Sequence, residues 1–358
     1  MKKKIIFSTG GTGGHIFPAI HLMSHFFEKN YDTILVTDVR GDSFIKKNLK
    51  FKSYILPADT PTNKKFLKRI LSFLLIFYSI IKSIIILKKE KPDLVFGMGG
   101  YVSFPISLTS KLFNIPLVIY ESNMVLGRAN KILAPISKKI FLSKKNLENY
   151  SEKYKVKTHY VSSIVAKKII NYKNTKRNEN NNFSILVLGG SQGAEVFGDV
   201  IPPVINLLKS EGFNIKIAHQ CIAMHKKKIS DYYEKHHINN YVFEFNKDVE
   251  DLIASSNLAI TRCGASTTAE LVYMLTPFIA VPIPNSVDNH QFLNAKYYEN
   301  EGCCWILEQK YFNKQNLHDL IVETIKNKNK LENIKQNMKK NNYTNAYKEI
   351  EKEIEKII

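Results

Sequence analysis

The chain has 358 residues, of which 44% are hydrophobic and 23% charged, and its formal net charge is +20. This apolar content excludes a wholly disordered chain, and the length predicts two domains that each bury a core. The four cysteines show no CxxC spacing, which argues against a disulfide scaffold or a zinc site and favours a reducing cytoplasm. Nucleic acid, an anionic membrane, an acidic substrate or a lysine-rich composition could each explain the charge, since only five of the 52 basic residues are arginine.

The first part of the chain alternates short apolar runs with segments that resemble helices. A strand is predicted at residues 4–7, followed by a glycine loop and a helix from about 18 to 29. Further strands are predicted at 33–36, 93–96 and 116–120. Continuous apolar strands separated by helices are typical of βαβ units, so we expect a parallel sheet that is covered on both faces.

Residues 66–87 form the most apolar segment, and residues 44–91 contain twelve basic and two acidic residues. Polar positions at helical spacing leave a broad apolar arc, which fits a crossover helix packed on the sheet. It also fits a helix partly buried in a lipid interface with its lysines at anionic headgroups, and the two interpretations can hold together. The residues expected to touch the membrane are Lys64, Lys65, Lys68, Arg69, Phe73 and Phe77.

No membrane crossing is expected from the sequence. The longest charge-free apolar stretch, 70–81, is shorter than the ~20 residues that a spanning helix needs. The apolar run after the first lysines is also too short for the core of a signal peptide.

The strand pattern restarts after a polar segment that ends near residue 182. Strands are predicted at 184–188, 215–218, 258–260 and 278–281, and the tail from about 314 is predicted to be helical. We therefore expect an α/β protein with two Rossmann-like, doubly wound parallel-sheet domains. The expected ranges are 1–165 for the N-terminal domain, 166–182 for a linker, 183–340 for the C-terminal domain, and 341–358 for a helix that returns to the N-terminal domain.

Glycine clusters follow predicted strands at 10–14, 97–100, 189–193 and 264. Ligands of parallel sheets bind beyond the carboxyl ends of the strands, where glycine lets the backbone approach a phosphate and the next helix offers free N–H groups. None of the clusters has the dinucleotide or P-loop spacing, so simple tight turns stay open as an alternative. His15 could serve as a general base, and Glu270 could either bind ribose hydroxyls or complement a helix dipole.

These motifs, in this order, resemble the MurG family of GT-B glycosyltransferases. The segments that carry the resemblance are 10–18 (GGTGGHIFP), 97–105 (GMGGYVSFP), 121–123 (ESN), 189–194 (GGSQGA), 219–220 (HQ), 262–270 (RCGASTTAE), 281–282 (VP) and 288–295 (DNHQFLNA). The resemblance implies two Rossmann-like domains that face each other across a cleft. It also implies a metal-independent, inverting transfer of N-acetylglucosamine from UDP-N-acetylglucosamine to the undecaprenyl-linked lipid I acceptor, which forms lipid II in peptidoglycan synthesis. No cofactor is implied, and the expected location is the cytoplasmic face of the inner membrane, as a peripheral protein on its anionic surface.

The resemblance also implies roles for individual residues. The acceptor is expected at Thr12, Gly13, Gly14 and His15, with His15 as the catalytic base, and Asn123 is expected near the donor sugar or the acceptor. The donor diphosphate is expected at Ser191, Gln192 and Gly193, with Arg262 beside the leaving group. The remaining donor positions are Asn246, Ala265, Ser266, Thr267, Thr268 and Ala269, together with Glu270 at the ribose and His290 and Gln291 at N-acetylglucosamine.

Three positions depart from the family pattern. Ala166 stands where an arginine that contacts the donor is expected, Tyr120 stands where histidine is usual, and Cys221-Ile222 replaces Ser-Gly. These departures bear on donor affinity more than on the type of reaction. Another GT-B enzyme, such as a nucleotide-sugar epimerase or a transferase with a different acceptor, is the alternative. A nucleic-acid-binding protein is a remote one, because the basic cluster is interleaved with aliphatic residues and no nucleic-acid module is found. The oligomeric state is left open.

Overall fold

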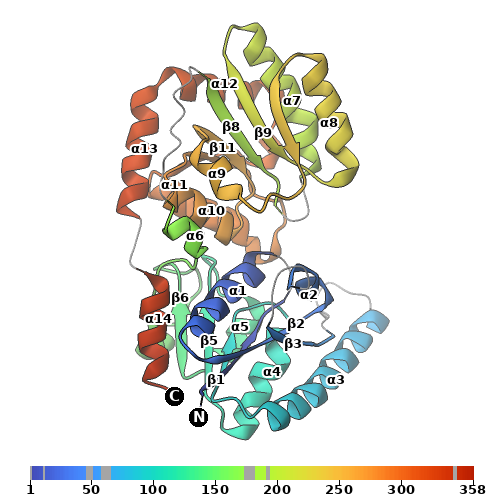
Figure 1. Cartoon of the computed structure of the whole chain (residues 1–358), viewed down its shortest axis with the longest axis vertical. Coiled ribbons are helices and arrows are strands. Elements are labelled where there is room, and N and C mark those ends of the chain that lie inside the picture. Colours follow the sequence, from blue (N-terminus) through green and yellow to red (C-terminus); the bar gives the residue numbers. More distant parts are fainter. Residues whose placement is uncertain are drawn as a thin grey trace. The chain divides into compact units, whose positions relative to one another are not determined.

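The computed structural model describes residues 2–10, 13–45, 51–57, 66–172, 182–190, 194–341 and 345–358. The chain divides into two compact units (Figure 1). The first unit is Met1–Ile164 with Tyr343–Ile358, and the second unit is Val165–Asn342. Each has its own parallel sheet, which confirms the expected class of two doubly wound α/β domains.

The sheet of the first unit has seven described strands, all parallel, in the order β3-β2-β1-β4-β5-β6-β7. They are β1 (Lys4–Ser8), β2 (Asp32–Thr37), β3 (Lys52–Ile55), β4 (Leu94–Gly97), β5 (Leu117–Glu121), β6 (Lys139–Leu142) and β7 (Thr158–Tyr160). The strand order reverses between β1 and β4. Ligands of doubly wound sheets bind beyond the carboxyl ends of the strands at such a reversal.

Helices cover both faces of this sheet. They are α1 (Gly13–Glu28), α2 (Val39–Ile45), α3 (Phe66–Glu90), α4 (Ser103–Ser110), α5 (Arg128–Leu133) and α14 (Ala346–Glu355), with the short 3-10 helices η1 (Lys111–Phe113) and η2 (Glu152–Lys157). On one face, Ile6 and Ile34 share a buried cluster with Leu87 of α3 and Ile106 of α4. On the other face, Phe26 of α1 packs against Phe7, and α14 lies beside α1.

The second unit repeats the plan with six described strands in the order β10-β9-β8-β11-β12-β13. They are β8 (Phe183–Leu188), β9 (Ile215–Gln220), β10 (Asn239–Phe243), β11 (Leu258–Thr261), β12 (Phe278–Ala280) and β13 (Cys304–Ile306). Successive residues of a strand point to opposite faces, so an apolar strand can fill two cores. Ile185 and Val187 of β8 belong to one buried cluster, whereas Leu186 and Leu188 belong to another.

Seven of the helices described in the second unit sort into the same two clusters. The helices of this unit are α6 (Lys167–Ile170), α7 (Glu195–Ser210), α8 (Ala223–Lys235), α9 (Val249–Ala254), α10 (Ala265–Tyr273), α11 (His290–Asn300), α12 (Lys314–Lys326) and α13 (Lys328–Lys340), with η3 (Val287–Asn289) and η4 (Gln309–Tyr311). Side chains of α7, α8 and α12 fill the cluster around Ile185, and side chains of α9, α10, α11 and α13 fill the cluster around Leu186. Figure 1 shows α7 and α8 on one face and α10 and α11 on the other.

All eight predicted strands are present, but five others and several boundaries were not predicted. The strands without a prediction are β3, β6, β7, β10 and β13. Helix α1 begins at Gly13, earlier than expected, because the glycines themselves form its first turn. Within the expected linker 166–182, residues 167–170 form α6, and Ile169 packs in one cluster with Ala269 of α10. Residues 173–181 of that segment lie outside the described residues.

Candidate functional site

Two glycine loops of the first unit meet at the carboxyl ends of β1 and β4. Gly100 has φ +80°, and a Cβ there would lie 2.8 Å from the carbonyl oxygen of Gly10. Gly99 has φ +89°, and a Cβ there would lie 2.9 Å from Nδ1 of His15. Both the left-handed backbone and the lack of space require glycine. The loop after β4 therefore packs directly on the loop after β1 and beside the His15 ring.

His15 lies on the first turn of α1 and is half-buried. Gly13 is buried and Gly14 half-buried on the same turn, whereas Thr12 lies outside the described residues. The imidazole is thus held against the backbone of Gly99 at the edge of the sheet where ligands bind. An imidazole in this place is a candidate general base.

A buried carboxylate, Glu121, organises the loop that follows β5. It is 1% exposed and accepts hydrogen bonds from the backbone N–H groups of Asn123 (3.1 Å) and Gly127 (2.9 Å). It also accepts from the side-chain amides of Asn123 (2.9 Å) and Asn130 (3.0 Å). Four donors on one carboxylate fix the loop, so Glu121 sets the orientation of the Asn123 side chain. The sequence indicated Glu121 only as part of a motif; its signal was the spacing of Asn123, Gly127 and Asn130 after the strand.

Two departures from the family pattern occupy buried positions. The Tyr120 hydroxyl accepts from the Ile164 N–H (3.3 Å) and so ties β5 to the end of the first unit. Burial raises the pKa of Tyr120, so the phenol stays neutral. Ala166, where the donor arginine was expected, lies in a buried cluster with Ile169 and Ala269. That position is therefore part of the packing between α6 and α10.

Arg262 follows β11 in the second unit and is directed into the protein. Its Nη1 donates to the Val281 carbonyl (3.0 Å), and its Nη2 donates to Oε1 of Gln309 (2.7 Å). The guanidinium carbon lies 4.8 Å from the centre of the Phe197 ring. Burial lowers the pKa of Arg262. These contacts join the segment after β11 to Val281 after β12 and to Gln309 of η4, and they use the guanidinium that was expected beside the leaving group.

Gln291, on the first turn of α11, also joins the segment after β11 to the segment after β12. Its Oε1 accepts from the N–H groups of Cys263 (3.2 Å) and Ile283 (3.1 Å). Because the oxygen is used in this way, the carboxamide nitrogen is the atom that could donate to a ligand. The neighbouring His290 has its Nδ1 2.8 Å from the Val287 carbonyl oxygen, which fixes the plane of its ring.

Helix α10 separates the predicted donor residues into an inner and an outer group. The inner group is buried: Thr268 Oγ1 donates to the Gly264 carbonyl (3.1 Å), and Ala265 and Ala269 are buried apolar positions. Side chains of the outer group remain partly exposed, and its members are Ser266, Thr267 and Glu270. Of the predicted donor residues on α10, this outer group is the one whose side chains are not buried.

Glu270 is the titratable group of α10. Desolvation raises its pKa to about 7, the charge of Lys168 opposes that rise, and the charge of Glu250 adds to it. Lys168 Nζ lies 2.6 Å from Oε2 of Glu250, so the cation is held by that neighbouring carboxylate. Glu270 therefore changes its charge near neutral pH.

The other expected donor residues contribute less to the described site. Asn246 is half-buried in the loop after β10, where its Oδ1 accepts from the Asp248 N–H (2.8 Å). Gly190 has φ +78° at the end of β8, and Ser191, Gln192 and Gly193 lie outside the described residues. Within the described part of the chain, no group of three or more His, Cys, Asp or Glu residues is arranged to hold a metal ion.

Helix α3 carries its apolar side outward. Ser72, Ser79 and Ser83 are fully buried, and the small serine side chains allow α3 to lie close to α4. The opposite side exposes a row of large apolar residues: Ile70, Leu71, Phe73, Leu74, Phe77, Tyr78, Ile81 and Ile85. Phe73 is 53% and Phe77 63% exposed. This is the reverse of an ordinary crossover helix, which buries its apolar arc on the sheet.

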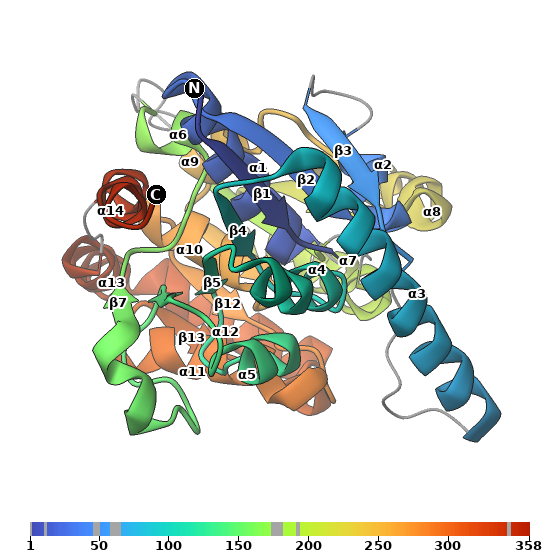
Figure 2. The same cartoon turned by 90° about the horizontal axis from the view of Figure 1, so that it is seen from below.

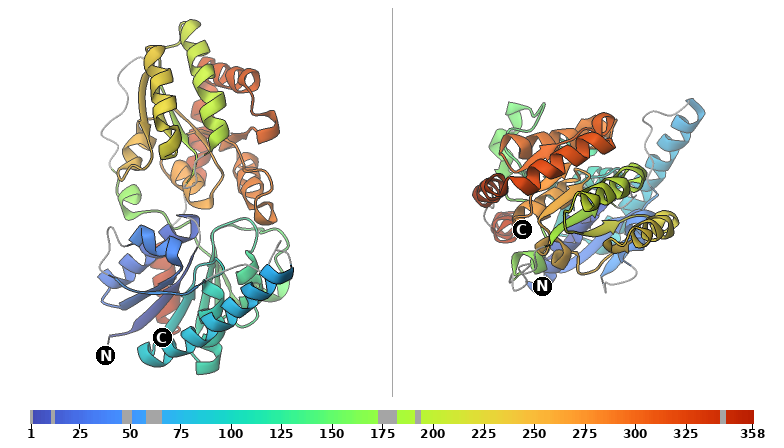
Figure 3. Two further views of the ribbon diagram at one scale, coloured as in Figure 1. Left: turned by 90° about the vertical axis from the view of Figure 1, so that its right-hand side faces the viewer. Right: turned by 90° about the horizontal axis from the view of Figure 1, so that it is seen from above.

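The C-terminal end of α3 is fixed to the sheet. Glu90 binds Nζ of Lys52 (2.6 Å) and of Lys4 (3.3 Å) and accepts from the Tyr54 hydroxyl. Burial alone would raise the pKa of Glu90, but these three partners outweigh it and hold the pKa at about 2. The other end of α3 extends beyond the sheet that it crosses (Figures 2 and 3).

Of the helices described, α3 is the one that is long and apolar enough to cross a membrane, over Ile70–Glu90. It also connects β3 to β4 of the same parallel sheet, and Ile86 and Leu87 are buried in the core of the first unit. A helix that must return to the next strand of its own sheet has both ends in one domain. The geometry of the crossover thus argues against a transmembrane position.

Two family models match the chain, one for each unit. Residues 5–142 match the glycosyltransferase family 28 N-terminal domain, and residues 184–354 match the glycosyltransferase family 28 C-terminal domain. A relative from Pelagibacter ubique is 37% identical over 335 residues, which cover 92% of this chain and 91% of the relative. A relative from Rickettsia bellii is 34% identical over 337 residues, with 92% and 93% covered. Both are named UDP-N-acetylglucosamine–N-acetylmuramyl-(pentapeptide) pyrophosphoryl-undecaprenol N-acetylglucosamine transferase.

Solved structures share the fold along the whole chain. The crystal structure of Acinetobacter baumannii MurG has a TM-score of 0.77 at 24% identity and covers 99% of both chains. A UDP-GlcNAc 2-epimerase from Neisseria meningitidis, bound to UDP-GlcNAc, has a TM-score of 0.67 at 15% identity over 99% of this chain and all of the other. At these identities the likeness concerns the fold alone.

Proposed function

The chain belongs to glycosyltransferase family 28, and we propose that it transfers N-acetylglucosamine from UDP-N-acetylglucosamine to N-acetylmuramyl-(pentapeptide) pyrophosphoryl-undecaprenol, a step of peptidoglycan synthesis. One observation carries the proposal: relatives named for this reaction match at 34–37% identity over 91–93% of their own length. Both family 28 domains are present in order, so the chain has the parts that a donor and an acceptor require.

The proposed reaction is a single displacement with inversion. The acceptor hydroxyl attacks the anomeric carbon of N-acetylglucosamine, the bond from that carbon to the UDP oxygen breaks, and UDP leaves with the electron pair. The proton of the hydroxyl goes to the imidazole of His15. One step needs one base and no nucleophile of the enzyme, which fits a single half-buried histidine beside the glycine loops.

The loop after β5 supports the same step from the neighbouring strand. Glu121 holds the backbone and the side-chain amide of Asn123, so the loop keeps its shape when a substrate binds. We assign Asn123 to contact a sugar and Glu121 to positioning Asn123. Fixed polar groups assist a reaction because they need no reorganisation at the transition state.

We place the donor on the outer side of α10 and the first turn of α11. Glu270 would accept hydrogen bonds from the ribose hydroxyls, and Gln291 and His290 would contact N-acetylglucosamine hydroxyls. The diphosphate is proposed at Ser191, Gln192 and Gly193, beyond β8. Arg262, Thr268 and Ala269 are left out of this proposal because their side chains are used inside the unit.

The outward apolar row of α3 supports peripheral binding to a membrane. Burying its phenylalanines in the acyl region removes exposed apolar area from water, and the lysines and Arg69 near the start of α3 would meet anionic headgroups. The proposed acceptor is lipid-linked, so a site at the membrane surface would reach it without extracting it. We therefore propose the cytoplasmic face of the inner membrane as the working location.

The experiment that tests the function is UDP release from UDP-N-acetylglucosamine, with and without a soluble lipid I analogue. We expect release that depends on the analogue, with the disaccharide as the second product. Conversion of the donor alone into an epimeric nucleotide sugar would favour the epimerase alternative. UDP release with an unrelated acceptor, but not with the lipid I analogue, would mean that the protein uses a different acceptor from the one proposed.

A further inference from the structure

We propose that Arg40 binds the diphosphate of the acceptor at the rim of the glycine loops, and that Asp38 is the residue that positions Arg40. The identity of the acceptor rests on the proposed function. The geometry itself rests on described residues of the first unit alone.

Asp38 directly follows β2, the neighbour of β1 in the sheet. It is 5% exposed, and its Oδ1 accepts from the Gly41 N–H at 2.7 Å. Its Oδ2 accepts from Nη2 of Arg40 at 2.9 Å and from Nε at 3.3 Å. A buried carboxylate with its own backbone anchor is a rigid support, so the plane of the guanidinium is set by Asp38.

Asp38 lies directly against the glycine loops. A Cβ at Gly10 would lie 3.3 Å from Oδ2 of Asp38. This oxygen is the one that accepts the hydrogen bonds from Arg40. Gly10 in turn touches Gly100, and the neighbouring Gly99 touches His15. Arg40, Asp38, the two loops and His15 therefore follow one another around the carboxyl edge of a single sheet.

The chemistry of Arg40 fits a diphosphate. Its side chain is 67% exposed although Asp38 holds it, so a ligand can reach the guanidinium. A planar fork of N–H donors matches the paired oxygens of phosphate, which the point charge of lysine does not. Only five of the 52 basic residues of the chain are arginine, so an arginine at position 40 is unusual in a chain whose basic residues are mostly lysine.

The order of groups along the edge fits the proposed acceptor. In N-acetylmuramyl pyrophosphoryl-undecaprenol, one sugar bears both the diphosphate and the hydroxyl that is attacked. The base and the diphosphate site must then be separated by roughly one sugar ring. His15 lies against Gly99, and Asp38, which holds Arg40, lies against Gly10, so the proposed base and the proposed diphosphate site border different glycines of the two packed loops.

The first test compares Arg40→Ala and Arg40→Lys with the unchanged protein in the transfer assay. We expect Arg40→Ala to raise KM for the lipid I analogue about tenfold to a hundredfold, as for a lost charge-assisted hydrogen bond, with KM for UDP-N-acetylglucosamine nearly unchanged. Arg40→Lys should recover only part of the loss. Lys111→Ala removes an exposed cation of the same unit and is the matched control. An unchanged acceptor KM in Arg40→Ala would overturn the proposal.

Asp38→Asn tests the positioning role. It keeps an oxygen for the Gly41 N–H but removes the charge that orients the guanidinium. We expect a rise in acceptor KM that is smaller than in Arg40→Ala, and no further rise in the double variant. Full additivity of the two changes would show that Asp38 acts independently of Arg40.

Two binding measurements separate this inference from the proposed function and from lipid headgroups. With UDP present at saturation, inorganic pyrophosphate should raise the thermal midpoint of the unchanged protein and not of Arg40→Ala, whether or not transfer is observed. Sedimentation with phosphatidylglycerol vesicles that lack acceptor should be equal in the two proteins. Loss of vesicle binding in Arg40→Ala with an unchanged response to pyrophosphate would assign Arg40 to the membrane surface and overturn the proposal.

Discussion

Nε2 of His25 lies 2.8 Å from Oε2 of Glu351, and the two residues are 326 positions apart in the sequence. Both side chains are mostly buried, and Lys29 Nζ lies 3.1 Å from the other oxygen of Glu351. Burial would raise the pKa of Glu351, but Lys29 and His25 outweigh it and lower the pKa. This contact fastens α14 to α1, so the end of the chain is a structural part of the first unit.

Glu351→Gln should destabilise the first unit by about 1–2 kcal/mol, because it removes the charge from two hydrogen-bonded contacts. The loss is expected above the ordinary carboxyl pKa of about 4.3 and should vanish as pH falls through the lower folded-state pKa. Urea unfolding followed by circular dichroism measures it. The one tryptophan, Trp305, lies in β13 of the second unit, so its emission is an internal reference that should not shift. Exposed Glu355→Gln is the control, and equal midpoints for both variants would contradict the assignment.

His15→Ala should lower kcat by roughly 10²–10⁴-fold, the range for loss of a general base. The binding of UDP should stay nearly unchanged, because His15 belongs to the first unit and the proposed donor residues belong to the second. Turnover under saturating substrates and UDP titration by calorimetry give the two numbers. His21→Ala, on the same helix, is the matched control. A His15 variant with unaltered kcat would remove it from the proton transfer.

Donor binding should weaken as the pH falls through about 7, where Glu270 takes up a proton. If only the ionised carboxylate binds the ribose, the apparent Kd should rise about tenfold between pH 8 and pH 6. UDP-N-acetylglucosamine is the suitable ligand, because its doubly esterified diphosphate keeps its charge in this range. Glu270→Gln should bind weakly at every pH, with a flat profile. A sloping profile in that variant would mean that another group causes the pH dependence.

The strands that line the candidate site could be predicted because they are central. β1, β4, β8 and β11 are largely buried, and each either ends in a glycine or is followed by one within three residues, so apolar runs followed by glycine mark them. β3 and β10 lie at sheet edges, and their sequences, KSYI and NNYVF, lack a continuous apolar run. An edge strand needs less apolar sequence because part of it stays in solvent.

The sequence located the functional segments but not the direction of their side chains. Arg262 stood in the right motif, yet the Val281 carbonyl and Gln309 take up its guanidinium. Gln309 is 47 residues away, and no spacing rule connects the two. Asp38 and Arg40 received no role for the same reason, because their meaning depends on the contact of Asp38 with Gly10.

In α3 the sequence left two orientations open, and small residues decide between them. The serines of α3 appear polar in sequence, so the expectation of an ordinary crossover helix placed them outside. In the structure Ser79 donates to the Pro57 carbonyl and Ser83 to the Ser79 carbonyl, so both hydroxyls are satisfied while buried. Hydrogen bonding within the unit removes the cost of burying them and lets the apolar row face outward.

Replacing Phe73 and Phe77 by serine should reduce partitioning onto phosphatidylglycerol vesicles more than tenfold, since each buried phenylalanine contributes about 1.5–3 kcal/mol. Leu112→Ser changes another exposed apolar residue of the first unit, outside α3, and should have little effect. Sedimentation at two salt concentrations measures the partitioning onto vesicles, which contains both the apolar and the electrostatic contribution to binding.

Charge reversal at the start of α3 tests the electrostatic part alone. Changing Lys68 and Arg69, with the preceding Lys64 and Lys65, to glutamate should abolish sedimentation with anionic vesicles. Lys64 and Lys65 lie outside the described residues. Salt should weaken the binding of the unchanged protein, because headgroup attraction is screened. Undiminished binding of the reversed variant would leave the apolar row as the sole contact.

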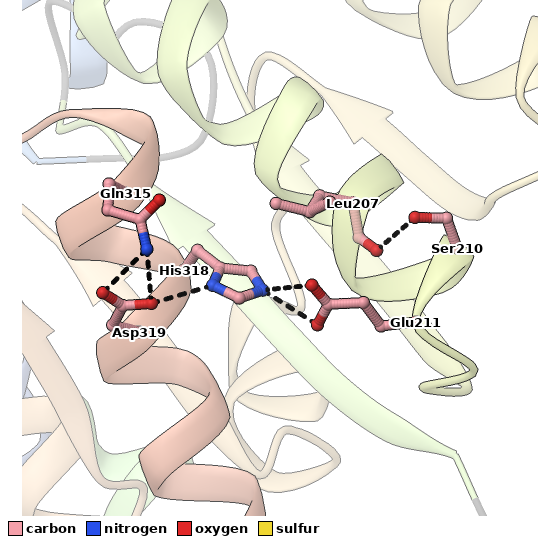
Figure 4. A network of polar contacts seen from close by, with 6 residues as sticks. All are labelled: Leu207, Ser210, Glu211, Gln315, His318 and Asp319. Atoms are coloured by element: carbon pink, nitrogen blue, oxygen red, sulfur yellow. Dashed lines mark hydrogen bonds and ion pairs between the residues drawn. The ribbon is translucent and has the colours of Figure 1, made fainter.

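The second unit carries a histidine network that should make its stability depend on pH (Figure 4). His318 of α12 has Nε2 2.9 Å from Oε2 of Glu211, just after α7, and Nδ1 3.0 Å from Oδ1 of Asp319. Burial lowers the pKa of His318, but the two carboxylates outweigh it and raise the pKa above its ordinary value. The charged imidazole therefore ties α12 to the end of α7.

A raised histidine pKa stabilises the fold fully below the unfolded-state value of about 6.5 and ceases to do so as the pH rises through the folded-state pKa. The urea midpoint of the second unit, read from Trp305 emission, should fall between about pH 6 and pH 8, with a change below about 1 kcal/mol since the carboxylates stay partly solvated. His318→Gln should flatten this slope, and Glu211→Gln should reduce it, because the partner that raises the pKa loses its charge. The difference in slope between His318→Gln and the unchanged protein is the quantity that decides, and equal slopes would exclude the network as the cause.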